Sequence, residues 1–163
     1  MAFQLTLFNN QLVNVRALKE VLVCNDLTSR YGLSLTKMQA LELIKIRGDS
    51  LRANGRIEFG GGIIDKIIKV FCDSDYLSQE NYAETLGELL EIFYYYKNEA
   101  LDDLSDDELI DLMKNYFDGT CAGSLELLRN RELDKEARDI RRGHQLSDLY
   151  SDSKAVQGEY DYE

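Results

Sequence analysis

Residues 82–100 read YAETLGELLEIFYYYKNEA and carry the longest apolar periodicity in the chain. Large apolar side chains return at alternating steps of four and three residues, at Tyr82, Leu86, Leu89, Phe93, Tyr96 and Ala100. This spacing places them on one face of an α-helix and is typical of a helix packed in a bundle. The stripe lasts about three heptads, which is too short to require a coiled coil. The segment therefore predicts the longest helix of an all-α fold.

Shorter stripes on both sides extend this prediction along the chain. We expect a first helix over Leu12–Leu22 and a further short helix that buries Ile64, Ile67, Ile68 and Phe71. Other helices are expected to begin after capping residues at Thr36, Ser78, Ser105 and Ser124. Thr36 to Gln39 and Ser105 to Glu108 are capping boxes, while Asn54-Gly55 and Gly119 mark helix ends. The helix that begins after Thr36 is expected to bury Leu41, Ile44, Gly48 and Leu51.

The fold class that follows is a compact array of five to six helices. Phe3, Leu5 and Leu7 alternate with polar residues in a strand period, so the prediction leaves room for one very short β-strand pair with residues 56–59. A chain of 163 residues suits one hydrophobic core. We expect a single helical domain over residues 1–146 and a polar, acidic tail over residues 147–163.

Composition narrows the possible partners and the compartment. The formal net charge of −11 repels phosphate backbones, and no basic stripe offsets it, so nucleic acid is not an expected partner. Cys24, Cys72 and Cys121 lie among apolar neighbours, as buried thiols in a reducing compartment do. Neither a signal peptide nor a run of about 18 apolar residues is found. The sequence therefore predicts a cytoplasmic protein that binds no membrane.

Five strings carry a resemblance to known proteins: Ser34-Leu35-Thr36, the run from Gly55 to Ile63, Phe71-Cys72-Asp73-Ser74, the run from Asn81 to Leu86, and the run from Ser105 to Leu109. Over about residues 30–130 the chain resembles a family of small clostridial-type (Firmicutes) bacterial proteins of unknown function. The resemblance implies a bacterial, cytosolic protein. It supplies no catalytic residue, because that family brings no assigned activity.

The three glycines Gly60, Gly61 and Gly62 precede a predicted helix and are a candidate ligand or anion site. Backbone amides without a hydrogen-bond partner at a helix start attract anions. The side chains that could lie around them are those of Arg52, Arg56, Glu58 and Arg47. The run lacks the lysine and the serine or threonine of a nucleotide phosphate loop. The interpretation that we favour is a tight connection where two helices cross closely.

Residues 73–84 have part of a calcium-loop pattern. Asp73, Asp75 and Glu84 supply carboxylates at loop positions one, three and twelve. Leu77 stands where an oxygen ligand is needed, and Ser78 stands where the sharp turn needs glycine. The segment is at most a degenerate calcium-binding helix-loop-helix, and we favour an ordinary loop in which Ser78 caps the next helix.

Two features could contact a partner protein. Consecutive helical residues point about 100° apart, so Tyr94 or Tyr95 should be at least partly exposed when Tyr96 lies in the buried stripe. Asp102, Asp103, Asp106 and Asp107 belong to an acidic run without a basic residue. This run is either a docking face for a basic partner or, as we favour, a solvated helix start.

No catalytic motif emerges from the sequence, and its single histidine, His144, lies near the polar tail. We therefore lean against an enzyme, predict no cofactor, and expect a non-catalytic helical module that binds another protein or a second copy of itself. The alternative is a small-ligand or anion-binding protein, or an enzyme, with its site at the turn from Arg56 to Gly62.

Overall fold

The computed structural model describes residues 15–99 and 103–142, and its regular elements there are all helical, as the apolar spacing predicts. Residues 15–23 form the first helix, followed by α2 (Asn25–Thr28) and the short turn η1 (Ser29–Tyr31). The longer helices are α3 (Lys37–Ala53), α4 (Gly62–Phe71), α5 (Tyr82–Glu99) and α6 (Asp106–Asp118). The C-terminal helix consists of α7 (Leu125–Leu127), η2 (Leu128–Glu132) and residues 133–142.

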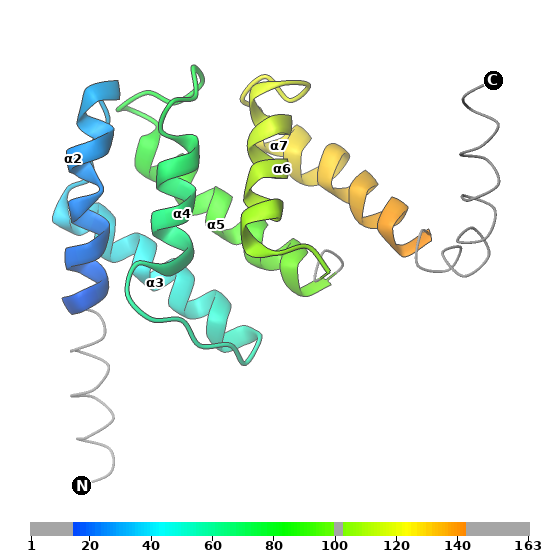
Figure 1. Cartoon of the computed structure of the whole chain (residues 1–163), viewed down its shortest axis with the longest axis horizontal. Coiled ribbons are helices and arrows are strands. Elements are labelled where there is room, and N and C mark those ends of the chain that lie inside the picture. Colours follow the sequence, from blue (N-terminus) through cyan, green and yellow to red (C-terminus); the bar gives the residue numbers. More distant parts are fainter. Residues whose placement is uncertain (1–14, 100–102, 143–163) are drawn as a thin grey trace, which may run out of the picture.

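The helices form two layers, and successive helices alternate between them (Figure 1). Residues 15–23 with α2, then α4, then α6 stand side by side in the nearer layer, and α3, α5 and the C-terminal helix cross behind them. Within the nearer layer α4 contacts α2 and α6, and within the other layer α5 contacts α3 and α7. Each inner helix is therefore enclosed by its neighbours on both sides.

The core lies between these layers and is centred on α5. The predicted stripe of α5 is buried at Tyr82, Leu86, Leu89, Phe93 and Tyr96, whereas Ala100 lies outside the described residues. From α4 the same core receives Ile63, Ile64, Ile67, Ile68 and Phe71. Each large side chain buried in this way contributes about 1.5–3 kcal/mol of transfer free energy. The hydrophobic stripe is thus the main source of stability.

The predicted caps are present at three helix starts. The backbone amide of Gln39 donates to the Thr36 hydroxyl at 3.1 Å, and the backbone amide of Thr36 donates to the side-chain oxygen of Gln39 at 2.9 Å. Ser105 and Glu108 form the same reciprocal pair, with both distances 3.1 Å. Ser124 accepts from the Leu127 amide at 3.2 Å. These bonds satisfy amides that a helix start otherwise leaves unpaired.

A π turn in the C-terminal helix was not predicted. In η2 the Leu133 amide donates to the Leu128 carbonyl, five residues earlier. Leu128 and Leu133 therefore both face the core, although five residues would rotate them apart on a regular α-helix. The Tyr96 hydroxyl donates to the carbonyl of Arg129 within this turn, which connects α5 to the C-terminal helix.

Other expectations need correction. Ser78 does not cap α5, because the helix begins only at Tyr82, and the Ser78 amide donates instead to the Asn81 side chain at 2.9 Å. In α3 the chain buries Ala40, Leu43 and Arg47 in addition to Ile44 and Leu51, while Leu41 and Gly48 are only half-buried.

The short strand pair is not found either, because residues 56–59 form no strand. The proposed partner at residues 3–7 and the tail at residues 147–163 lie outside the described residues. The domain boundaries at residues 146 and 147 therefore stay predictions.

Replacement of Thr36 by alanine should lower the free energy of unfolding by about 1 kcal/mol, because the Gln39 amide loses its acceptor. Urea denaturation followed by circular dichroism measures this change. Ser34→Ala is the matched control, since the hydrogen bonds of Ser34 to Gln79 use its backbone alone. Equal losses in the two variants would show that the Thr36 hydroxyl does not stabilise α3.

Candidate functional site

The connection between α3 and α4 is held by the carboxylate of Glu58. This carboxylate accepts a hydrogen bond from the Ile63 amide at 3.1 Å and another from the hydroxyl of Tyr94 in α5. Tyr94 is only 2 % exposed, and burial together with the adjacent carboxylate raises its pKa far above the usual range. Glu58 therefore joins the connection to the first turn of α4 and to the C-terminal half of α5.

Arg47 supports the same connection from α3. Its side chain is buried, and the residue is only 3 % exposed. The guanidinium donates to the Gly60 carbonyl at 2.7 Å, and its Nη1 lies 3.8 Å from Glu58 Oε1. A buried guanidinium without partners would be costly, so these contacts restrict the path of residues 58–60.

The glycines at the turn are required by their backbone angles and surroundings. Gly60 has φ of 62° and Gly62 has φ of 49°, in the left-handed region that other residues rarely adopt. A Cβ atom at Gly62 would also lie 3.0 Å from Arg47 Nη1. This geometry fits the interpretation of the run as a tight connection with closely approaching neighbours.

Carboxylates of the chain itself already occupy two amides of the turn. Gly61 donates to Glu20 Oε2 at 2.6 Å, and Ile63 donates to Glu58 as described above. The bond from Gly61, and then the ion pair with Arg16 at 3.1 Å, lower the pKa of Glu20. An external anion would have to displace these carboxylates before it could bind the same amides.

The structure assembles part of the predicted ligand site. Glu58, Gly60, Gly61 and Gly62 lie together, and Arg47 joins them as expected. Arg52 is instead on the surface in an ion pair with Asp49, and Arg56 is exposed. Tyr94 and Glu20 were not predicted to lie at this site. Glu20 is distant in sequence and its neighbours carry no motif, so no sequence signal could have identified it.

The same connection exposes two large apolar side chains. Ile57 is 79 % exposed and Phe59 is 72 % exposed, whereas Glu58 between them is half-buried. Successive side chains of an extended segment point in opposite directions, so anchoring Glu58 inward directs Ile57 and Phe59 outward. We call residues 56–59 the apolar loop.

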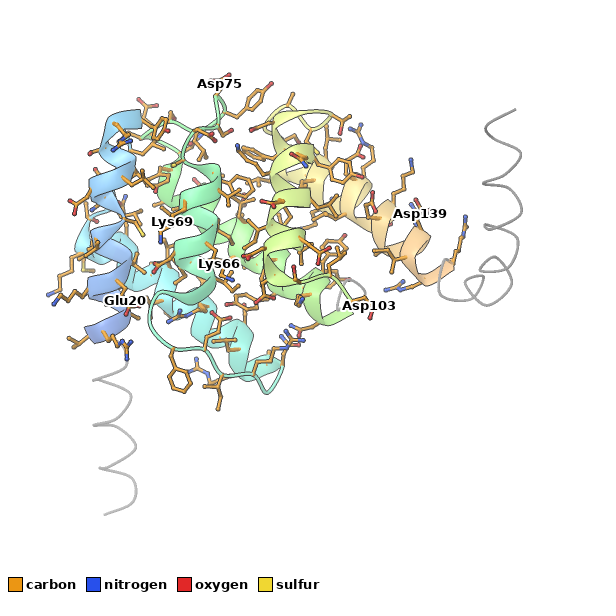
Figure 2. The ribbon with its side chains drawn as sticks, in the orientation of Figure 1. Glu20, Lys66, Lys69, Asp75, Asp103 and Asp139 are labelled. Atoms are coloured by element: carbon orange, nitrogen blue, oxygen red, sulfur yellow. The ribbon has the colours of Figure 1, made fainter. Side chains whose placement is uncertain are left out.

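A cleft of about 600 Å³ lies between the first helix and α4. Figure 2 shows Glu20 at the base of this region, beside the start of α4, and Lys69 further along α4. The cleft is lined by three basic and three acidic side chains, namely Arg16, Lys19, Lys69, Glu20, Asp26 and Asp65. It is therefore balanced in charge, in contrast to the electropositive cleft that an anion site at the turn would have.

The thiol within this cleft belongs to Cys24 and donates a hydrogen bond to Asp65 at 3.6 Å. Burial, and then the charge of Asp65, raises the pKa of the Cys24 thiol to about 11. Burial also raises the pKa of Asp65. Because only a thiolate is a strong nucleophile, this cysteine is not activated for covalent chemistry at neutral pH.

Of the residues predicted to contact a partner, the structure exposes some and buries or pairs others. Tyr95 is 58 % exposed, whereas Tyr94 is buried and is therefore not available as a contact residue, which corrects its inclusion. Asp106 pairs with Lys97 at 3.3 Å, and Asp107 pairs with Lys66 at 3.0 Å. Asp103 is exposed, as Figure 2 shows, and Asp102 lies outside the described residues. Much of the acidic run is thus engaged within the molecule.

In the segment that has part of a calcium-loop pattern, residues 73–84, the first carboxylate forms an ion pair. Asp73 accepts from Lys114 at 2.7 Å, and the Ser74 hydroxyl donates to Asp118 at 2.6 Å. Asp75 lies at the tip of the loop between α4 and α5 (Figure 2), while Glu84 is on α5. Within residues 15–99 and 103–142, no group of three or more His, Cys, Asp or Glu side chains could hold a metal ion.

Removal of the buried guanidinium should destabilise the fold strongly. We expect Arg47→Met to lower the free energy of unfolding by about 3 kcal/mol, because it leaves Gly60 and Glu58 without this partner in a buried site. Arg52→Met, on the exposed side of the same helix, should cost below about 1 kcal/mol. Denaturant unfolding of both variants gives the comparison. Similar losses would contradict the role assigned to Arg47.

The bond between Glu20 and Gly61 should make stability depend on pH. Because the pKa of Glu20 is lower in the folded chain, its contribution is present above the unfolded pKa and is lost as pH falls through the folded pKa. The free energy of unfolding of Glu20→Gln should therefore be lower than that of the wild type at about pH 6. The two free energies should become nearly equal at about pH 3. Glu80→Gln, an exposed change of equal charge, should not show this convergence.

Comparison with known proteins places the chain in a family without assigning an activity. Of the helices in the described part, none is long and apolar enough to cross a membrane. No curated protein and no solved structure matches the chain. A family model described as "Family of unknown function (DUF6323)" matches residues 20–146, which include the glycine turn, the apolar loop and α5. The chain therefore belongs to this family of unknown function.

Proposed function

We propose that the protein is a non-catalytic module of the bacterial cytoplasm that binds another protein through its apolar loop. The observation that carries this proposal is the exposure of Ile57 and Phe59, at 79 % and 72 %, on a backbone that is anchored on both sides. Exposed apolar side chains that lie close together often mark contact sites. Here two of them are separated by the single residue Glu58.

The anchoring makes the loop suitable for binding. Arg47 holds the Gly60 carbonyl, Glu58 binds Tyr94 and Ile63, and the Arg56 amide donates to the Leu51 carbonyl at 2.9 Å. A loop that is already ordered loses little conformational entropy when it binds. Burial of an isoleucine or phenylalanine side chain then contributes about 1.5–3 kcal/mol each. Such a pair could act as the hot spot of a small interface.

The flanking charges suggest the chemistry of the partner surface. Arg56 is the first residue of the loop and Arg52 lies four residues before it, and both are exposed, although the chain as a whole carries a net charge of −11. Arginine beside apolar anchors is common at the centre of protein interfaces. The partner is expected to offer an apolar pocket with acidic groups at its edge. It is either another protein or a second copy of this chain.

The second candidate is a small-ligand site in the cleft beside Glu20 and Asp65. Its volume of about 600 Å³ lies within the range of small-molecule pockets. Its mixture of basic and acidic side chains would suit a zwitterion better than a simple anion. We rank this function below protein binding, because the amides of Gly61 and Ile63 in the neighbouring turn, which could have held an anionic group of the ligand, are occupied by Glu20 and Glu58.

Affinity capture from the native host with paired variants tests the proposal. The double variant Ile57→Ser and Phe59→Ser should lose partners that the wild type retains, because it removes the apolar anchors. The matched control Tyr31→Ser and Met38→Ser changes exposed apolar side chains elsewhere, at 49 % and 75 % exposure. Quantitative mass spectrometry identifies the retained proteins, and sedimentation of each variant tests self-association.

We expect that the wild type and the control variant retain a partner protein, or form a dimer, and that the variant without Ile57 and Phe59 does neither. If all three proteins retain the same set and sediment alike, the apolar loop is not the binding surface.

A further inference from the structure

A second surface lies between α3 and α5, which stand next to each other in the layer behind α4 (Figure 1). It is a groove of about 300 Å³ with a mostly apolar floor made by Leu43, Ile46, Ala83 and Gly87. No residue that lines the groove belongs to the connection from Arg56 to Gly62. The groove is therefore separate from the apolar loop.

The edges of this groove are acidic. Glu42, Glu84, Glu88 and Glu91 line it, and no lysine or arginine does. Within the described part of the chain none of the four makes a hydrogen bond or an ion pair. Asp106 and Asp107, in contrast, are paired with lysines. Four carboxylates around apolar side chains thus have no ion-pair partner among the described residues.

We propose that this groove binds an amphipathic helical segment of a partner protein, with its apolar side on Ile46 and Ala83 and with lysine or arginine residues facing the glutamates. A helix placed in a groove between two helices repeats the packing already present inside the molecule. Charge complementarity selects a basic partner, because an acidic segment would be repelled by the glutamates.

The spacing of the glutamates supports a helical partner. Glu84, Glu88 and Glu91 follow each other at steps of four and three residues along α5, so they form one row on its surface. From residue 83 to residue 91 the helix rises by about 12 Å, which corresponds to about two turns. Basic residues repeated at helical spacing on the partner could therefore meet this row in register.

The groove continues towards an exposed aromatic residue. Glu91 also lines a second hollow, of about 550 Å³, together with Tyr95, Tyr96 and Arg129 at the π turn. The rings of Tyr95 and Tyr96 meet edge to face, with centroids 5.0 Å apart. Tyr95 is thus supported by a buried neighbour and could contact the end of the bound segment.

Binding of a designed peptide tests this proposal on the full chain. The probe is a fluorescent amphipathic peptide of about 18 residues, built from leucine and lysine so that leucine follows helical spacing. Two comparison peptides have the same residues in scrambled order, or glutamate in place of lysine. Fluorescence anisotropy at about 0.15 M salt gives the dissociation constants. We expect the patterned basic peptide to bind most tightly, and the glutamate peptide not to bind.

Variants separate the groove from the general acidity of the protein. Glu84→Gln, Glu88→Gln and Glu91→Gln combined should weaken binding by about tenfold or more. The control combines Asp75→Asn, Glu80→Gln and Glu126→Gln, which removes three exposed acids elsewhere and should change the affinity by less than about twofold. Ile46→Ser, which keeps the charge, should weaken binding by about fivefold or more.

The variant of the apolar loop, with Ile57→Ser and Phe59→Ser, should bind the peptide as the wild type does. This result would distinguish the groove from the function proposed above, because either surface could fail without the other. The groove proposal is overturned if the scrambled peptide binds equally well, if both triple variants weaken binding equally, or if Ile46→Ser has no effect.

Discussion

The arrangement of the candidate site depends on a charge inside the core. Arg47 enters the protein from α3 and is held there by the Gly60 carbonyl and by Glu58. Such a group is tolerated only where its partners are fixed, because an unpaired buried charge is very costly. Glu58 must consequently face inward, and the extended backbone around it must present Ile57 and Phe59 to the outside. Two exposed apolar side chains are thus positioned by a buried charged group.

Sequence patterns predicted the parts of the fold that depend on local chemistry. The stripes of α4 and α5 and the capping boxes at Thr36 and Ser105 were confirmed, because capping bonds join residues three positions apart and periodic burial follows the spacing of apolar residues along the chain. Ser78 failed as a cap because several polar residues follow it, and the pattern could not tell which one begins the helix. The π turn could have been suspected from the five-residue step between Leu128 and Leu133.

The site was harder to predict because it is built from distant segments. Residues 56–59 were considered only as a strand partner for residues 3–7, yet they form no strand, and the side chain that faces inward there is that of Glu58. Nothing in the sequence near Glu20 indicates that its carboxylate meets Gly61, 41 residues later. Likewise, Tyr94 and Tyr95 could not be ranked by exposure until the neighbours of α5 were known. Contacts of this kind follow from packing, which a single sequence does not specify.

The alternation of helices between two layers has a consequence for how the molecule loses its structure. A helix in such an array is stabilised mainly by the elements next to it in the layers, so the free energy resembles a sum over adjacent pairs, as in tandem helical arrays. Opening can then begin at either terminal helix while α4 and α5 stay intact, and hydrogen exchange would slow towards the centre. The free energy of local opening would therefore rise from the two ends of the array towards its centre. The glycine turn lies near that centre, where the structure would open last.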